Sequence, residues 1–121
     1  MGYLSKEELL FERDENGELL PVDLPLKMLE KKDEKGKIIK PAPIIKYIPI
    51  PRGKWIKMIL TKNREEQDKM ILTEHVLEPK ITIEEYEKAA RPMLMTAMVT
   101  AITAHTLDQE EEDIKEQDQK N

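Results

Sequence analysis

The chain has 121 residues, of which 39 % are hydrophobic and 37 % charged, and its 20 basic and 25 acidic side chains give a net charge of −5. This length fits one small domain with a modest core, and the absence of cysteine excludes a disulfide framework, a thiolate metal site and a cysteine nucleophile. The longest uncharged stretch, residues 92–107, is shorter than the roughly 20 apolar residues of a membrane-spanning helix, so we expect a soluble protein of the cytoplasm without membrane contact.

The first 43 residues predict a charged, partly flexible arm with hairpin-like turns. The tetrads at residues 14–17 and 33–36 both place Asp at the first position of a type I turn and Gly at the fourth, so each can close a hairpin. Two interpretations are open for the start of the arm. Ser5 and Glu8 can form a capping box for a short helix, or an extended stretch can pair across the first turn.

Prolines dominate the next part of the chain. Six of them between Pro21 and Pro51 remove backbone hydrogen-bond donors. This pattern argues against a central strand and favours an extended edge arm. Residues 44–48 are the best strand candidate.

Helix signals begin after Pro51 and predict a helical domain over residues 44–107. Apolar side chains at three- and four-residue spacing predict a helix over residues 54–60, one face of which comprises Trp55, Ile56, Ile59 and Leu60. Three more helices are expected, each with its own start signal: residues 64–76 after Asn63, residues 83–90 after a capping box of Thr82 and Glu85, and residues 92–107 from Pro92. The predicted fold is mainly α, a small C-terminal helical bundle preceded by a proline-rich extended or β-hairpin arm.

The expected last helix, residues 92–107, has no charged face, although a surface helix in so small a domain should show one. One interpretation is a central core helix wrapped by the other three. The other is a helix whose second side, with Met95, Val99 and Leu107, needs a partner or a second subunit, for which methionines offer an adaptable surface. The residues expected to be core or partner-binding anchors are Trp55, Leu94, Met95, Met98, Val99 and Ile102.

The sequence offers no credible catalytic constellation. His75 and His105 occupy apolar or small-residue positions without acidic pairs at metal spacing, so both are expected to be structural and no metal site is predicted. Four glycines in no phosphate-binding arrangement exclude a Rossmann turn and a P-loop. Ser5 is the only serine, and it has no base at a suggestive spacing. We expect a protein that is not an enzyme and uses no cofactor.

Charge is distributed unevenly along the chain. Residues 36–63 carry 7 basic and no acidic side chains, whereas residues 108–121 carry 2 basic and 7 acidic ones and predict a disordered acidic tail. The basic residues interleave with Tyr47 and Trp55, as in a nucleic-acid patch, or they pair with acidic faces of the fold or of a protein partner. The candidate basic patch comprises Lys46, Arg52, Lys54 and Lys57.

Three local features follow one another in the second half of the chain. An extended segment ends in the turn Pro51-Arg52-Gly53 before a helix, a helix ends at Glu78-Pro79-Lys80 and restarts at Thr82-Ile83-Glu84-Glu85, and an Ala- and Ile-rich helix follows over residues 97–104. This layout resembles the small tail assembly chaperones of long-tailed, siphovirus-type bacteriophages and prophages. The resemblance covers roughly residues 44–107 and includes no catalytic motif.

The resemblance implies a chaperone that binds the long, helical, aggregation-prone tape measure protein while tail tube subunits assemble around it. Such a protein would act in the cytoplasm of the infected bacterial host and would be absent from the mature virion. Its partners would be the tape measure protein, the tail tube protein or a second copy of itself. In this family a longer form commonly arises by ribosomal frameshifting, and the codons of residues 119–121 can be adenine-rich enough for slippage.

Two other functions stay open from the sequence. One is a small nucleic-acid-binding or regulatory protein that uses residues 37–62, which would bind in a salt-dependent manner. The other is a structural component of the tail or of head completion, which would be present in purified particles.

Overall fold

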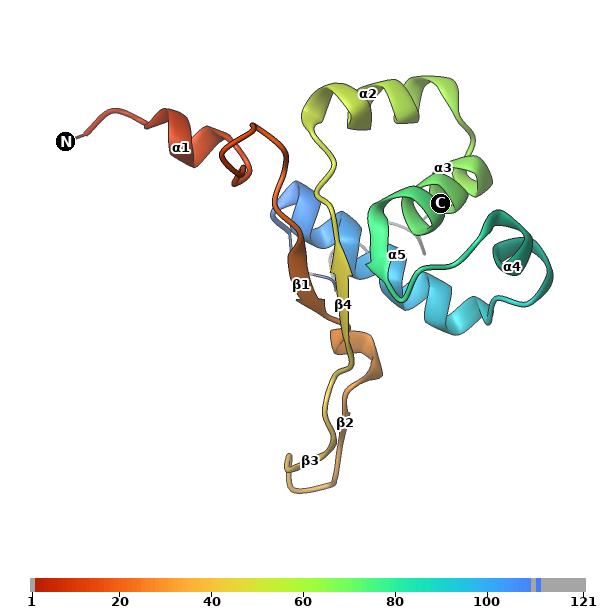
Figure 1. The fold of residues 1–121 in the computed structure, drawn as a ribbon. Coiled ribbons are helices and arrows are strands. Elements are labelled where there is room, and N and C mark those ends of the chain that lie inside the picture. Colours follow the sequence, from red (N-terminus) through yellow and green to blue (C-terminus); the bar gives the residue numbers. More distant parts are fainter. Residues whose placement is uncertain (1, 110, 112–121) are drawn as a thin grey trace.

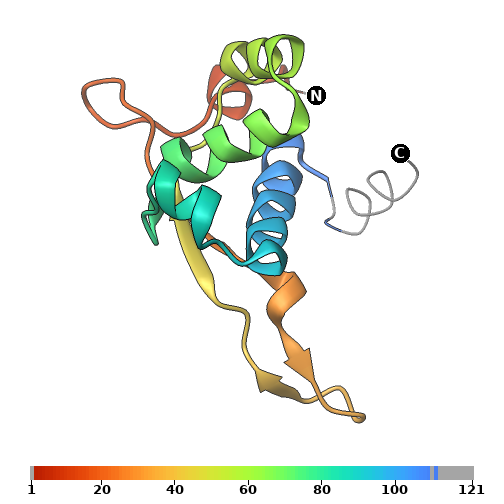
Figure 2. The same cartoon turned by 90° about the vertical axis from the view of Figure 1, so that its right-hand side faces the viewer.

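A computed structural model of the chain describes residues 2–109 and 111 (Figure 1). It shows helices packed around a small sheet, with an N-terminal arm and a hairpin that projects away from the sheet (Figure 1 and Figure 2). Most of the predicted acidic tail, residues 108–121, lies outside the described residues. Among the described helices, none combines the length and the apolar character needed to cross a membrane.

In chain order the elements are α1 (Lys6–Leu9), β1 (Val22–Pro25), the 3₁₀ helix η1 (Lys27–Leu29), β2 (Lys31–Lys32), β3 (Ile38–Lys40), β4 (Ile44–Tyr47), α2 (Arg52–Thr61), α3 (Arg64–Met70), the π-helix η2 (Ile71–His75), β5 (Val76–Glu78), α4 (Ile83–Lys88) and α5 (Pro92–Leu107).

The prediction of a mainly α fold is wrong. The described residues are 48 % helical and 17 % strand, and their strands form two small antiparallel sheets, so the fold is an α/β mix. The larger sheet has the strand order β1–β4–β5, and the smaller one is the β2–β3 hairpin. In the β1–β4 ladder Val22 lies opposite Tyr47 and Pro25 lies opposite Ile44. The domain boundary predicted after residue 43 therefore separates two strands that are hydrogen-bonded neighbours.

Strand β4 confirms the predicted strand, but it lies in the middle of its sheet rather than at an edge. Pro43 precedes β4 and Pro49 follows it, so the strand itself keeps all its amide donors for pairing on both sides. Pro25 ends the edge strand β1, where a missing donor costs little. The predicted edge arm is wrong, because the number of prolines does not show which of them lie within a strand and which lie just outside it.

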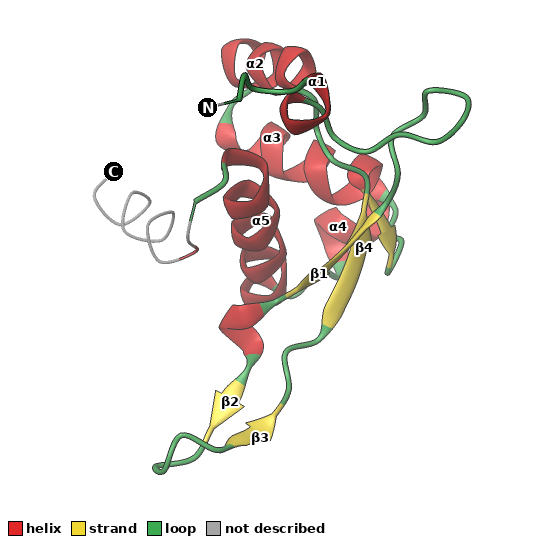
Figure 3. Ribbon diagram, turned by 90° about the vertical axis from the view of Figure 1, so that its left-hand side faces the viewer, coloured by secondary structure: helices red, strands yellow, loops and turns green. Residues whose placement is uncertain are grey.

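Helix α5 packs against the sheet and forms the centre of the core (Figure 3). Its middle turns are enclosed by the chain itself, since Met98 is 4 % and Ile102 0 % exposed. Val99, expected on a side that needs a partner, is also buried. Of the two interpretations of residues 92–107, the structure therefore supports the first, in which this segment is a central core helix. The core cluster comprises Leu26, Ile45, Tyr47, Ile50, Met58, Met70, Ile71, Leu72, Val76, Met98, Val99, Ala101 and Ile102.

The N-terminal arm contains parts of both interpretations left open for it. Ser5 caps α1, since its Oγ accepts a hydrogen bond from the amide of Glu8 at 3.2 Å. After α1, an isolated bridge between Arg13 and Leu19 pairs the chain across the turn that contains Gly17. This glycine has a φ of +81°, as the predicted turn requires. The second predicted turn closes the β2–β3 hairpin.

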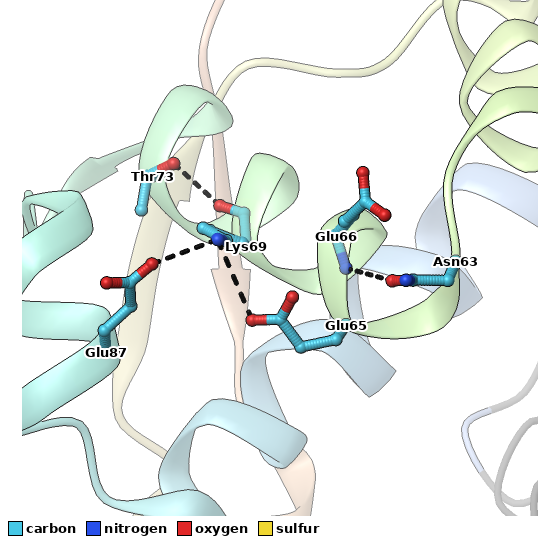
Figure 4. Close-up of polar contacts among 6 residues, drawn as sticks. All are labelled: Asn63, Glu65, Glu66, Lys69, Thr73 and Glu87. Atoms are coloured by element: carbon cyan, nitrogen blue, oxygen red, sulfur yellow. Dashed lines mark hydrogen bonds and ion pairs between the residues drawn. The ribbon is translucent and has the colours of Figure 1, made fainter.

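The later helices begin at the predicted caps. Asn63 starts α3 by accepting a hydrogen bond from the amide of Glu66 at 2.8 Å (Figure 4). Thr82 and Glu85 form the expected capping box of α4. Pro92 occupies the first turn of α5, where its missing amide proton is not needed.

The helix expected over residues 64–76 is confirmed to within one residue. It consists of α3 followed directly by the π-helix η2, and the chain then turns into strand β5, which begins at Val76. The amide of Ile48 donates a hydrogen bond to the carbonyl oxygen of His75 at 2.8 Å and so ties η2 to the chain beyond β4. Of the apolar residues that gave the helical pattern, Ile71 and Leu72 lie on η2 and Val76 is the first residue of the strand.

His75 is buried, with 5 % of its surface exposed. Its Nδ1 lies 2.8 Å from the carbonyl oxygen of Ile48, so Nδ1 carries a proton and donates it. Nε2 is then a buried acceptor that has no hydrogen-bond partner among the described residues. Burial lowers the pKa of His75 below its usual range, and the cations of Lys54 and Lys80 act in the same direction, against the hydrogen bond to Ile48 and the charge of Glu74.

Acidification is expected to destabilise the fold through His75. In the unfolded chain this imidazole takes up a proton near its ordinary pKa of about 6.5, whereas the folded state resists protonation. The free energy of unfolding should be fully retained above about pH 7.5 and should fall by up to ~1 kcal/mol between about pH 7 and about pH 5.5. Urea unfolding at these two pH values measures the loss. The His75→Gln variant should lack this loss of unfolding free energy, whereas the His105→Gln variant, changed at an exposed position, should show it as the wild type does. An equal loss in the wild type and both variants would contradict this account.

Candidate interaction surface

Helix α2 is covered by the rest of the fold on one side only. Met58 is 2 % exposed and Trp55 is half-buried, so this side faces the core. Ile56, Ile59 and Leu60 remain 36 %, 46 % and 78 % exposed. These three residues, here called the α2 stripe, have i, i+3 and i+4 spacing and lie side by side on the helix. The predicted face of this helix is thus half-buried at Trp55 and exposed at the α2 stripe, because no second layer covers α2 (Figure 1).

A cleft lies beside the α2 stripe, between α2, α3 and α5. Its volume is about 170 Å³. Ile59 and Leu107 are lining residues that stay partly exposed, at 46 % and 41 %. Arg64 and Asp68, an ion pair with 3.2 Å between Nε and Oδ1, form a polar wall. The cleft, here called the α2–α5 cleft, is lined by Trp55, Met58, Ile59, Arg64, Gln67, Asp68, Ile71, Val99, Thr100, Thr103 and Leu107.

The stripe and the cleft together form an apolar surface with a polar margin. Burial of such a surface by a partner contributes a favourable free energy of roughly 25 cal/mol per Å² of apolar area. Exposed apolar residues that are contiguous, unlike scattered ones, are typical of interaction sites. Helical side chains of a partner could enter the cleft while the partner's backbone lies along the stripe.

The other side of α2 carries lysines. Lys54, Lys57 and Lys62 line a second cleft of about 380 Å³, together with the buried side chains of Met58 and Met70. Among the described residues, no ion pair joins these three lysines to a carboxylate. Glu74 is the one carboxylate that lines this cleft, so the three lysines leave an excess of positive charge for a partner.

The structure divides the predicted basic patch into two parts. Arg52, Lys54 and Lys57 lie together on α2, and all three are exposed. Lys46 lies apart from them, on β4, where its register partners are Asp23 on β1 and Glu78 on β5. Opposite charges on neighbouring strands attract each other, so Lys46 stabilises the sheet.

No family model, no curated protein and no solved structure matches the chain. Within the part of the chain that is described, no group of three or more His, Cys, Asp or Glu side chains could hold a metal ion. The apolar side and the basic side of α2 are each available to a partner.

The predicted anchor residues separate into core and surface. Met98, Val99 and Ile102 are buried on α5, and Val99 also reaches the wall of the α2–α5 cleft. Trp55 lines the same cleft from α2. Leu94, 39 % exposed, lies at the start of α5, and its neighbour Met95 lines a different cleft between α3, α4 and α5.

Sequence reasoning missed that the α2 stripe is exposed. A signal was present, because α2 carries apolar residues at Trp55, Ile56, Met58, Ile59 and Leu60, which cannot all point to one side of a ten-residue helix. The same argument was applied to α5, where the sheet and the other helices do cover all sides of the middle turns.

Proposed function

We propose that the chain is a non-enzymatic tail assembly chaperone of a long-tailed bacteriophage or prophage. It binds the tape measure protein in the cytoplasm of the bacterial host, keeps it soluble while the tail tube assembles, and is absent from the mature virion. The observation that carries this proposal is the exposed apolar stripe on α2 beside an open cleft. The layout of residues 44–107, in which Pro51 is the N-cap of α2 and Arg52 and Gly53 are its first residues, supports it further.

The surface fits a helical client. An amphipathic helix presents apolar side chains at i, i+3, i+4 and i+7, which match a groove about one helix wide. Ile59 and Leu107 flank the entrance to such a groove, and Trp55 offers a large flat side chain inside it. The lysines on the other side of α2 keep the complex soluble and can pair with carboxylates of the client.

The proposed docking element differs from the one expected from sequence. Residues 92–107 were candidates because of their uncharged character, but the middle of α5 is enclosed and cannot also bind a client. The short helix α2 takes over this role, with the C-terminal turn of α5 as the opposite wall.

Coexpression with the tape measure protein tests the proposal. The wild-type chain should keep this client in the soluble fraction and copurify with it. Ile59→Asp and Leu60→Asp should reduce the recovered complex by about tenfold or more, because a carboxylate would have to be desolvated at the interface. Leu9→Asp is the matched control, since Leu9 is 66 % exposed and lies on α1, away from the cleft. A client that is no more soluble with the chain than without it would refute the proposal.

Nucleic-acid binding is the second candidate, favoured by the three lysines of α2 that have no ion pair among the described residues. It requires a salt-dependent shift of a nucleic-acid probe that Lys54→Glu/Lys57→Glu abolishes. The tape measure complex should instead depend on the α2 stripe, so the two sets of variants distinguish the candidates.

A further inference from the structure

The β2–β3 hairpin extends into solvent without cover from its own chain. In all three ribbon views it projects away from the helices (Figure 1, Figure 2 and Figure 3). Residues 31–40 contain five lysines and two acidic residues, a net charge of +3. Ile38 and Ile39 are 51 % and 68 % exposed. The hairpin therefore combines positive charge with two adjacent large apolar side chains.

The turn of this hairpin is well ordered by local hydrogen bonds. The carboxylate of Asp33 accepts hydrogen bonds from the amides of Lys35 and Lys37, both at 2.9 Å. Gly36 has a φ of +83°, which closes the turn without steric strain. A hairpin shaped in advance loses little conformational freedom on binding, which favours a role as an interaction element.

A cleft of complementary character lies between α3, α4 and α5. It has a volume of about 380 Å³ and an apolar base that includes Leu72 and Met95. Three carboxylates line it, and the lining residues include no lysine or arginine. We call it the acidic cleft; its lining residues are Glu65, Asp68, Leu72, Tyr86, Glu87, Ala90, Pro92, Met95, Thr96 and Val99.

The acidic cleft has more carboxylates than cations, because Arg64 pairs with Asp68 at 3.2 Å and a single lysine serves the other two carboxylates. Lys69 beside it pairs with both Glu87, at 3.1 Å, and Glu65, at 3.9 Å, so one cation serves two carboxylates (Figure 4). The hydrogen bond to Glu87 and the charge of Glu65 raise the pKa of Lys69. Burial raises the pKa of Tyr86, and the charges of Asp68 and Glu65 raise it further. A second cation could therefore be accommodated at this rim.

We propose that the β2–β3 hairpin of one copy of the chain docks into the acidic cleft of a second copy. Lys37 and Lys40 would approach the carboxylates of Glu65 and Glu87, while Ile38, which lies on the same face of β3 as Lys40, covers the apolar lining residues of the cleft. The views show the hairpin and α4 well apart, so the hairpin reaches another copy's cleft rather than its own (Figure 1 and Figure 2). Two different surfaces meet in this contact, which gives either a reciprocal dimer or a head-to-tail ring. The inference is independent of the proposed function, because it uses neither α2 nor a client.

Charge reversal tests the contact from both sides. The double variant Lys37→Glu/Lys40→Glu reverses two charges on the hairpin, and Glu65→Lys/Glu87→Lys reverses two charges in the lining of the acidic cleft. Lys40 lies opposite Lys31 in the hairpin, so its reversal replaces a like-charge pair by an attractive one and leaves the hairpin able to form. Lys54→Glu/Lys57→Glu, on α2, makes the same change in net charge elsewhere and is the matched control.

Analytical ultracentrifugation at low and high salt is the measurement, with circular dichroism to verify folding. The wild-type chain and the control should self-associate at low salt. Each reversed protein alone should associate about tenfold or more weakly, and an equimolar mixture of the two should form complexes again, because each supplies the charge that the other's surface now needs.

Three results would overturn the inference. The wild-type chain could remain monomeric at every concentration, the reversed proteins could associate as strongly as wild type, or their mixture could fail to associate. A monomeric wild-type chain that binds duplex DNA, with the binding lost in Lys37→Glu/Lys40→Glu, would assign the hairpin to nucleic acid instead.

Discussion

Replacing Met98 with aspartate is expected to unfold the chain. Met98 is 4 % exposed in the middle of α5, where its neighbours in the core cluster are apolar. An ionised carboxylate at this position would lose its hydration without gaining a partner, at a cost of about 4 kcal/mol or more. Proteins are stable by only about 5–15 kcal/mol, and a small domain with a modest core lies at the lower end of this range, so most of its stability would be lost. Circular dichroism and thermal unfolding measure the effect.

Met93→Asp is the matched control for this prediction. Met93 belongs to the same helix but is 66 % exposed, and it lies in the first turn, where the helix dipole favours a negative charge. Its unfolding temperature should stay close to that of the wild type. If Met98→Asp folded with a wild-type unfolding temperature, α5 would not be the core helix described above.

Truncation of Tyr47 is expected to have the second-largest effect. Tyr47 is 0 % exposed on the central strand β4, and its ring meets the ring of His105 edge to face, with centroids 5.6 Å apart and an angle of 85°. Its hydroxyl contacts Nδ1 of His105, and burial raises its pKa to about 12, so it stays protonated at neutral pH. Tyr47→Ala should lower the free energy of unfolding by about 3–5 kcal/mol, since it leaves a cavity between the sheet and α5.

The Tyr47→Phe variant distinguishes the contribution of the ring to stability from that of the hydroxyl group. It keeps the ring contact and removes the hydroxyl contact, so it should cost about 1 kcal/mol. Tyr3→Ala, at a fully exposed tyrosine, should be neutral. Chemical denaturation of the three variants gives the comparison, and a Tyr47→Ala protein as stable as Tyr3→Ala would show that strand β4 does not carry the core.

Features encoded by a few neighbouring residues could be predicted from the sequence. The cap of α3 at Asn63 needs one side chain and one amide three residues away. The turn before Gly36 needs an Asp and a Gly at fixed spacing. Such signals depend on covalent geometry and short-range hydrogen bonds, which the sequence displays directly.

The sheet could not be predicted because its pairings join distant segments. Strand β1 pairs with β4, and β4 pairs with β5, with long stretches of chain between them. Three or four residues per strand give too short a pattern to show alternation. The helical spacing of residues 64–76 ends at the first residue of β5, so the periodicity gave no sign of the strand that follows.

The candidate surface depended on the same long-range information. Both α2 and α5 carry apolar residues on more than one side, and the sequence cannot show which of the two is enclosed. The sheet, η1 and η2 pack around α5, whereas α2 has neighbours on one side only. Exposure of Leu60 and burial of Ile102 are therefore consequences of the tertiary arrangement.

Hydrogen exchange on the purified complex of the chain with the tape measure protein tests the central claim most directly. The account predicts slower amide exchange over residues 52–62 and at the C-terminal turn of α5 when the client is bound, with no such change in Leu60→Asp. Failure to form a complex, or a complex in which protection is confined to elements other than α2 and α5, would contradict it.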